Sequence, residues 1–202
     1  MNKRAIEKFS IQARRDLIDG IDLQLRLLGI DDQHATAARP ESTTQAEFYA
    51  DMALPLVGEE ITWRRQLVQE IQKRAAKSDW QTARKDLIEE VAYTWFNRII
   101  AIRFMEVNDY LTTGIRVLSS EDGSNEPEIM THTRELSWQF SETEQHIIDV
   151  ADRTLLPEDM DRKYRMLFLK QVSELRQSLP NLFEHTDDFM KLLFTPSYNK
   201  GV

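Results

Sequence analysis

A helical pattern between about residues 80 and 109 constrains the fold of this chain more than any other feature. Apolar side chains recur there every three or four residues, and toward the end of the segment they surround the helix on nearly all sides. Such a helix is typical of the centre of a helical domain. We therefore predict an all-α, multi-helix, bundle-like fold packed around it. The main apolar rows contain Leu87, Ile88, Val91, Ala92, Trp95, Phe96, Ile99 and Ile100.

Further helices are predicted on both sides of this segment, because Gly and Pro number only six each and fall mostly between periodic stretches. Gly29 is expected to end the first helix, and Ser141 with Glu144 matches a capping box. The predicted helices span about residues 3–28, 45–53, 59–77, 141–156, 161–179 and 187–194.

Two segments lack this periodicity. Residues 30–44 carry no large apolar side chain after Ile30, which predicts an exposed linker and makes it a candidate for mobility. Residues 111–133 contain Gly114, Gly123 and Pro127, which predict one irregular segment. We treat residues 1–202 as one helical domain.

Composition excludes several classes of protein. The chain has no Cys, which removes disulfides and thiolate metal sites, and it has no apolar run of about 18 residues to span a membrane. A cytoplasmic location is expected. The net charge of -8 is uneven, because residues 111–160 hold three basic and eleven acidic side chains whereas residues 1–30 hold six and four. The average acidity therefore does not exclude a basic surface on the first helix.

The sequence contains no motif for catalysis or cofactor binding. Its glycines never occur as Gly-x-Gly, and no two prolines are adjacent, so the Asn/Asp-Pro-Pro-aromatic loop of amino-methylating enzymes is absent. His146 has Glu142 and Asp149 on the same helix face, but a solvated surface explains this trio better than a metal site. We predict no catalytic, cofactor-binding or metal-ligating residue.

Basic side chains are the remaining candidates for a binding surface. Those that could contact a DNA backbone are Arg4, Lys8, Arg14, Arg15, Arg64 and Arg65. Ordinary solvated helix charges are the simpler interpretation. Arg98 and Arg103 differ, because apolar residues surround them in the long helix. Each should pair with a carboxylate such as Glu106 or with a buried carbonyl, or else face a partner.

The long helix also carries a resemblance. The run EVAYTWFNRIIAIRFMEVNDYL, residues 90–111, resembles the N-terminal region of the PglX family, the adenine-specific DNA methyltransferases of bacteriophage-exclusion (BREX) systems. Supporting segments occur in the order in which the family has them, so the resemblance covers nearly the whole chain. These segments are residues 9–18, 116–120, 126–129 and 179–184.

The resemblance implies a parent enzyme that transfers a methyl group from S-adenosylmethionine to adenine in a specific DNA site. Its catalytic domain would lie downstream of this chain, so the chain alone is expected to be inactive and to bind no cofactor. The expected partners are that domain, duplex DNA in a salt-sensitive manner, and other phage-exclusion components. An alternative is a non-catalytic module that docks such components through its acidic region. A third interpretation, an acidic mimic of DNA, conflicts with the basic helices.

Overall fold

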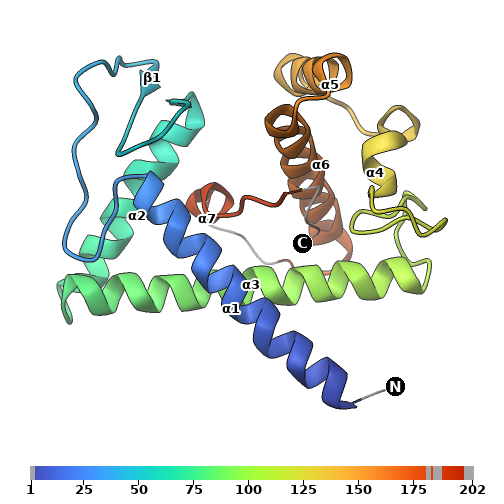
Figure 1. Ribbon diagram of the computed structural model, residues 1–202, viewed down its shortest axis with the longest axis horizontal. Coiled ribbons are helices and arrows are strands. Elements are labelled where there is room, and N and C mark those ends of the chain that lie inside the picture. The colour runs from blue at the N-terminus through green and yellow to red at the C-terminus, as the bar shows by residue number, and fades with distance from the viewer. Residues whose placement is uncertain (1–2, 181–182, 184–187, 198–202) are drawn as a thin grey trace. The chain divides into compact units, whose positions relative to one another are not determined.

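The computed structural model describes residues 3–180, 183 and 188–197. It confirms the all-α class, since its only sheet in this described part is one antiparallel pair, β1 (Ala46–Glu47) with β2 (Leu56–Val57). The chain forms two compact units, divided between Phe96 and Asn97 within helix α3 (Trp80–Val107) (Figure 1). This division by contacts does not test the prediction that residues 1–202 form one domain of a larger protein, which stays a prediction.

The first unit comprises α1 (Lys3–Leu27), β1, β2, α2 (Glu59–Ala75), the first part of α3, and α7 (Asp188–Leu192). Its core includes Leu25, Leu67 and Leu87, all with no exposed surface. The Trp95 ring stacks on the Phe194 ring with centroids 4.2 Å apart, and the Trp95 indole donates to the Met190 carbonyl at 3.2 Å. These contacts place α7, which also packs on α2, inside the first unit.

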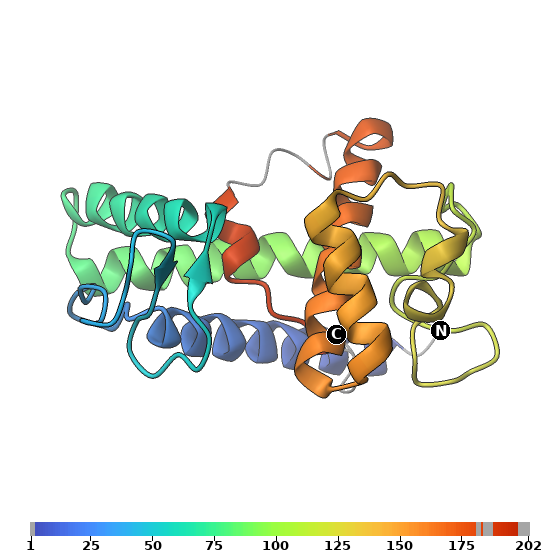
Figure 2. The same cartoon turned by 90° about the horizontal axis from the view of Figure 1, so that it is seen from above.

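The second unit comprises the rest of α3, then α4 (Glu128–Thr131), the 3-10 turn η1 (Thr133–Glu135), α5 (Glu142–Thr154) and α6 (Pro157–Ser178). Helices α5 and α6 pack side by side (Figure 2). The buried Lys163 ammonium of α6 joins this pair to α4, because it donates to Asp152 at 2.6 Å and to the Met130 carbonyl at 2.9 Å. Residues 111–127 contain no helix, as predicted, whereas α4 begins before the predicted irregular segment ends.

Local sequence signals explain where several helices begin and end. Gly29 ends α1 in a left-handed conformation with φ 69°, and a Cβ there would lie 2.1 Å from the Thr36 hydroxyl oxygen. The Asp79 carboxylate accepts from the Thr82 backbone N–H at the start of α3. Ser141 and Glu144 form the predicted capping box of α5. Pro157 starts α6, four residues before the helix start that we predicted.

The helix predicted over residues 45–53 is wrong. Residues 46–47 are extended in β1, and this strand pairs with β2. The Thr43 hydroxyl accepts from the Ala46 backbone N–H, as it would at a helix start, but the chain then follows strand pairing instead. Extended backbone places Glu47 and Tyr49 on one side, where both are buried against α2, and this tertiary contact overrides the local helix signal.

Two helices are less buried than their periodicity suggests. In α1, Ile21 and Leu25 are buried, whereas Phe9, which lies on the same four-residue spacing, is 55% exposed. In α3, Ile102 and Met105 are buried, whereas Ile100 is 42% exposed. Helix α3 contributes buried side chains to both units, but one face of its C-terminal part lies at the surface.

Candidate functional site

The strongest basic surface lies on the first half of α1. Residues 3–15 contain five Lys or Arg side chains and one Glu, and Arg4, Lys8 and Arg15 are all exposed. Their spacing of four and seven residues places these three on one side of the helix. Arg14 is also exposed, but its guanidinium lies 3.5 Å from the Glu89 carboxylate on α3. The structure therefore leaves a compact row of three surface cations for binding a polyanion.

Arg64 does not belong to this surface, contrary to our expectation. It is 5% exposed, and its guanidinium donates to the Leu28 carbonyl at 2.7 Å and to the Thr36 carbonyl at 2.9 Å. The same guanidinium lies over the Tyr49 ring, 3.3 Å from its centroid. Burial lowers the pKa of Arg64. Arg64 holds the segment after α1 in place and is inaccessible to a DNA phosphate.

Arg65, its neighbour, is largely exposed but already has a partner. Its guanidinium lies 2.7 Å from a carboxylate oxygen of the buried Glu47, and the Tyr49 hydroxyl donates to the other oxygen. Burial alone would raise the pKa of Glu47, but these two hydrogen bonds lower it below its usual value. Arg65 is therefore a weaker candidate for phosphate binding than the cations of α1.

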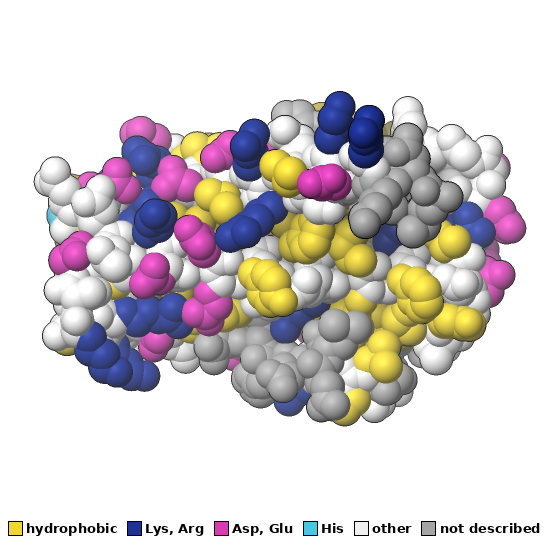
Figure 3. Space-filling view, turned by 90° about the horizontal axis from the view of Figure 1, so that it is seen from below, with side chains coloured by type: hydrophobic (Ala, Val, Ile, Leu, Met, Phe, Trp, Pro, Cys, Tyr) yellow, Lys and Arg dark blue, Asp and Glu magenta, His cyan; other side chains and the backbone are white. Residues whose placement is uncertain are grey.

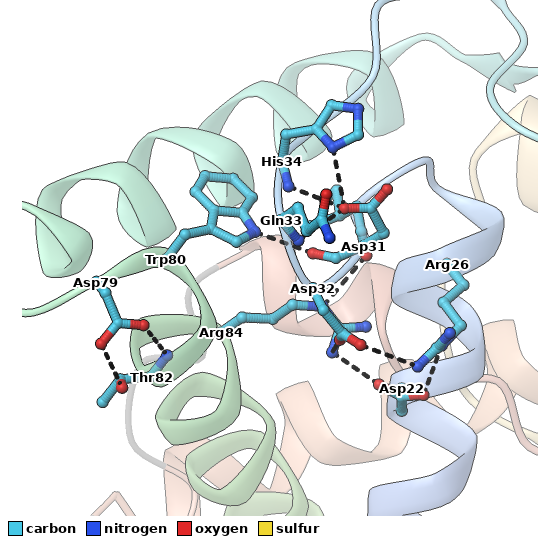
Figure 4. Close-up of polar contacts among 11 residues, drawn as sticks. Asp22, Arg26, Asp31, Asp32, Gln33, His34, Asp79, Trp80, Thr82 and Arg84 are labelled. Atoms are coloured by element: carbon cyan, nitrogen blue, oxygen red, sulfur yellow. Dashed lines mark hydrogen bonds and ion pairs between the residues drawn. The ribbon is translucent and has the colours of Figure 1, made fainter.

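A second buried arginine, which we did not predict as important, organises the loop after α1. Arg84 on α3 is 4% exposed and donates to Asp22 at 2.7 Å, to Asp32 at 3.0 Å and to the Ile30 carbonyl at 3.2 Å. Arg26 shares the Asp22 carboxylate at 2.8 Å (Figure 4). The sequence could have predicted this cluster, because Arg84 lies on the same face of α3 as the apolar Leu87 and Ile88.

The same loop is held at further points. The Trp80 indole donates to the Asp31 carbonyl at 2.9 Å, and the Asp31 side chain accepts from the backbone of His34 at 2.8 Å (Figure 4). Residues 30–36 of the predicted linker are thus joined to both α1 and α3. Because its hydrogen bonds join the loop to the helices, we interpret the cluster as structural.

A buried carboxylate performs a similar task in the second unit. Glu106 is 2% exposed and accepts from the backbone N–H groups of Val117 and Leu118. Arg103 also pairs with it at 3.0 Å, which confirms the carboxylate partner that the sequence predicted for Arg103. The Tyr164 hydroxyl donates to the Val117 carbonyl at 3.1 Å, so both α3 and α6 hold this segment. Burial raises the pKa of Tyr164.

Arg98 lies inside the second unit. It is 3% exposed, and burial lowers the pKa of its guanidinium. Arg98 is therefore a buried residue of the second unit and does not face a partner at the surface. Arg103 differs, because its side chain is 49% exposed while one of its nitrogens pairs with Glu106.

Many carboxylates of the acidic region also have internal partners. Glu128 accepts from the backbone N–H groups of Arg116 and Glu121, Glu144 pairs with Lys170 at 2.9 Å, and Asp152 pairs with Lys163. These groups stabilise the second unit. Part of the acidity of residues 111–160 is therefore used inside the second unit, and docking through this region stays a prediction.

The described residues provide no assembled metal site, since no three or more His, Asp or Glu side chains converge there. His146 is exposed on α5. Within the same part of the chain, no helix combines the length and the apolar character needed to cross a bilayer.

The chain is similar in sequence to members of one class of enzymes. Two similar curated proteins are both adenine-specific methyltransferases. One is PglX of Lacticaseibacillus casei (strain Zhang), which is 50% identical over 205 aligned residues that cover 100% of this chain. The other is BrxX of Escherichia coli O9:H4 (strain HS), which is 33% identical over 197 residues, or 96% of the chain.

These alignments confirm the resemblance to the PglX family that residues 90–111 first indicated. The chain spans only 17% of the length of PglX and 15% of the length of BrxX. No family model matches the chain.

Proposed function

We propose that this chain is the N-terminal helical region of a site-specific, S-adenosylmethionine-dependent DNA adenine methyltransferase of a phage-exclusion system. The observation that carries this proposal is the 50% identity to PglX across the whole chain. In such an enzyme the methyl transfer would take place outside these residues, because they contain neither a Gly-x-Gly turn nor adjacent prolines. The parent enzyme would act in the cytoplasm, where it would mark the DNA of its own cell.

Within that enzyme, we assign the chain the role of a rigid scaffold. The Arg84 and Glu106 clusters support this role, since each uses a buried charge to hold an irregular segment against helices. Buried charges that are paired with specific groups favour one arrangement of the chain, because an alternative arrangement loses those partners. Each unit would then present its own surface groups to DNA or to the catalytic domain in a constant geometry.

The proposal that catalysis and cofactor binding lie outside residues 1–202 can be tested with the full-length enzyme and with this chain. Methylation of adenine in cellular DNA, read by sequencing, is expected with the full-length enzyme. S-adenosylmethionine should bind the full-length enzyme in a calorimeter and should give no heat with residues 1–202. Specific binding of the cofactor to residues 1–202 would contradict the assignment.

A second role is supported by the row of cations on α1. We propose that Arg4, Lys8 and Arg15 contact the phosphate backbone of duplex DNA without reading its sequence, because all three are exposed on one side of a helix. Arg14 contributes less, since Glu89 already neutralises part of its charge. Arg64 takes no part in this contact.

Charge reversal tests this contact. Reversing all three to Glu should weaken binding of duplex DNA and reduce the slope of log affinity against log salt by about 2.7, because each phosphate contact contributes roughly 0.9. Reversal of Arg153, Arg162 and Arg176, three exposed arginines of the second unit, changes the net charge equally and is the matched control. Equal loss in both variants would show a general charge effect and would refute a specific contact through α1.

A further inference from the structure

The C-terminal part of α3 presents an apolar stripe at the surface of the second unit. Phe104, Val107 and Tyr110 are each 60% exposed, and Ile100 is 42% exposed. The rings of Phe104 and Tyr110 meet edge to face with centroids 6.0 Å apart. Figure 3 shows one face of the molecule on which apolar side chains reach the surface among charged ones. We call residues 100, 104, 107 and 110 the α3 stripe.

Helix geometry separates the stripe from the core of the second unit. Ile100, Phe104 and Val107 follow the four- and three-residue spacing of one helix face. Ile102, Met105 and Glu106, which are buried, lie on the opposite face. The stripe is therefore a second apolar face and not the edge of the first. A helix face that contacts only solvent is normally polar, so a second apolar face is unexpected there.

Helix formation does not explain the stripe either. Ile, Val and Phe form helices less readily than Lys, Glu or Ala, which usually occupy exposed helical positions. Polar groups lie beside the apolar side chains, namely the partly exposed Arg103 and the exposed Asn108. An apolar centre with a polar rim is the usual composition of a surface that packs against protein.

The size of the similar proteins indicates what covers this surface. The chain aligns with 17% of PglX and 15% of BrxX, so most of each relative consists of further polypeptide. Domains of one polypeptide pack through apolar patches, and the tether gives such a contact a high effective concentration. A contact made by four apolar side chains therefore suffices within one chain.

We propose that the α3 stripe is the surface on which the methyltransferase portion of the same polypeptide docks. This inference rests on the proposed function, because it requires that a methyltransferase portion exists. The docking portion presents an apolar recess of its own to Phe104 and Val107, and a carboxylate or carbonyl oxygen to the exposed side of Arg103. Docking fixes the position of the catalytic portion relative to the second unit.

A photo-crosslinking amino acid placed at position 104 of the full-length enzyme tests the proposal directly. Phe104 is exposed, so its replacement by benzoylphenylalanine keeps an aromatic ring without disturbing the core. After irradiation, mass spectrometry should find a crosslink from position 104 to a peptide beyond residue 202, in a species of monomer mass. The same probe at Leu155 of the second unit, which is 68% exposed, is the control and should give no such crosslink.

Other crosslinking results would overturn the docking proposal. A product of twice the monomer mass would assign the stripe to a second copy, and a crosslink to another protein would assign it to that partner. An absence of any crosslink from position 104 and from a second probe at position 110 would mean that the stripe stays in solvent.

A paired variant gives an independent readout. The Phe104→Ser, Val107→Ser variant should expose new protease sites in the full-length enzyme between the second unit and the downstream portion, while helical circular dichroism is retained. The Leu155→Ser, Leu156→Ser variant, which removes two exposed apolar side chains of the same unit, should digest like wild type. Identical digestion of both variants would contradict docking through the stripe.

Failure of docking is distinguishable from failure of the proposed function. An enzyme that methylates adenine but gives no crosslink at position 104 would refute the docking surface alone. A full-length protein that gives the crosslink but never methylates adenine would refute the methyltransferase assignment alone.

Discussion

Arg84 in the first unit and Glu106 in the second are both residues of α3, and both are buried charges that hold irregular backbone. They use opposite chemistry. Arg84 is neutralised by the carboxylates of Asp22 and Asp32, whose side chains are 31% and 49% exposed. Glu106 is held largely by backbone N–H groups inside the unit. A charge whose partners remain in contact with water can be lost at lower cost than one whose partners are buried.

Removal of the Glu106 carboxylate is expected to have the largest effect on stability. In Glu106→Ala the backbone N–H groups of Val117 and Leu118 lose their acceptor, and each unsatisfied group costs about 1–3 kcal/mol. We therefore expect a loss of about 3 kcal/mol in the free energy of unfolding, measured by urea denaturation. Glu106→Gln keeps one acceptor oxygen and should lose clearly less. Equal losses in both variants would mean that the negative charge, and not the hydrogen bonds, is what matters.

Removal of the Arg84 guanidinium should cost less. In Arg84→Met the alkyl volume is largely kept, and the partly exposed Asp22 and Asp32 can be rehydrated. We expect a loss of about 2 kcal/mol in the free energy of unfolding, together with faster amide exchange in residues 30–36, because the Ile30 carbonyl also loses its donor. A loss larger than that of Glu106→Ala would reverse the comparison between the two clusters.

Acid should affect the first cluster through Asp22. Burial alone would raise the pKa of Asp22, but the hydrogen bonds from Arg26 and Arg84 lower it below its ordinary value of 3.8. A depressed folded-state pKa contributes stability above the unfolded-state pKa, and this contribution is lost as the pH falls through the folded-state pKa.

The stability difference between wild type and Asp22→Asn should therefore be constant above about pH 4 and should shrink at lower pH. Urea denaturation at a series of pH values measures this difference. A difference that does not change between pH 5 and pH 2 would show that Asp22 contributes through its shape and not through its charge.

The sequence predicted much of the local structure, because helix ends depend on neighbouring residues. The capping box at Ser141 and the end of α1 at Gly29 are both confirmed. Each is a short-range hydrogen bond or a backbone conformation that one residue type favours. The pairing of Arg103 with Glu106 was predictable for the same reason, since three residues on a helix bring the two side chains together.

The errors occur where contacts between distant residues decide the outcome. Residues 46–47 form β1 because Glu47 and Tyr49 meet the side chains of Arg65 and Arg64, which are about 18 and 15 residues away. Arg64 was expected at the surface because its neighbour is also an arginine. Its burial depends on carbonyl groups of Leu28 and Thr36 that no local pattern reveals.

By itself, the sequence determined that α3 is a long helix with apolar side chains on nearly all sides. It also determined that residues 90–111 resemble the PglX family. Only the tertiary structure decided which of those sides are covered. The physical reason is that helical periodicity assigns residues to a common face, whereas burial requires another segment to lie against that face. Ile102 and Met105 are buried, while Phe104 and Val107 remain exposed on the opposite side.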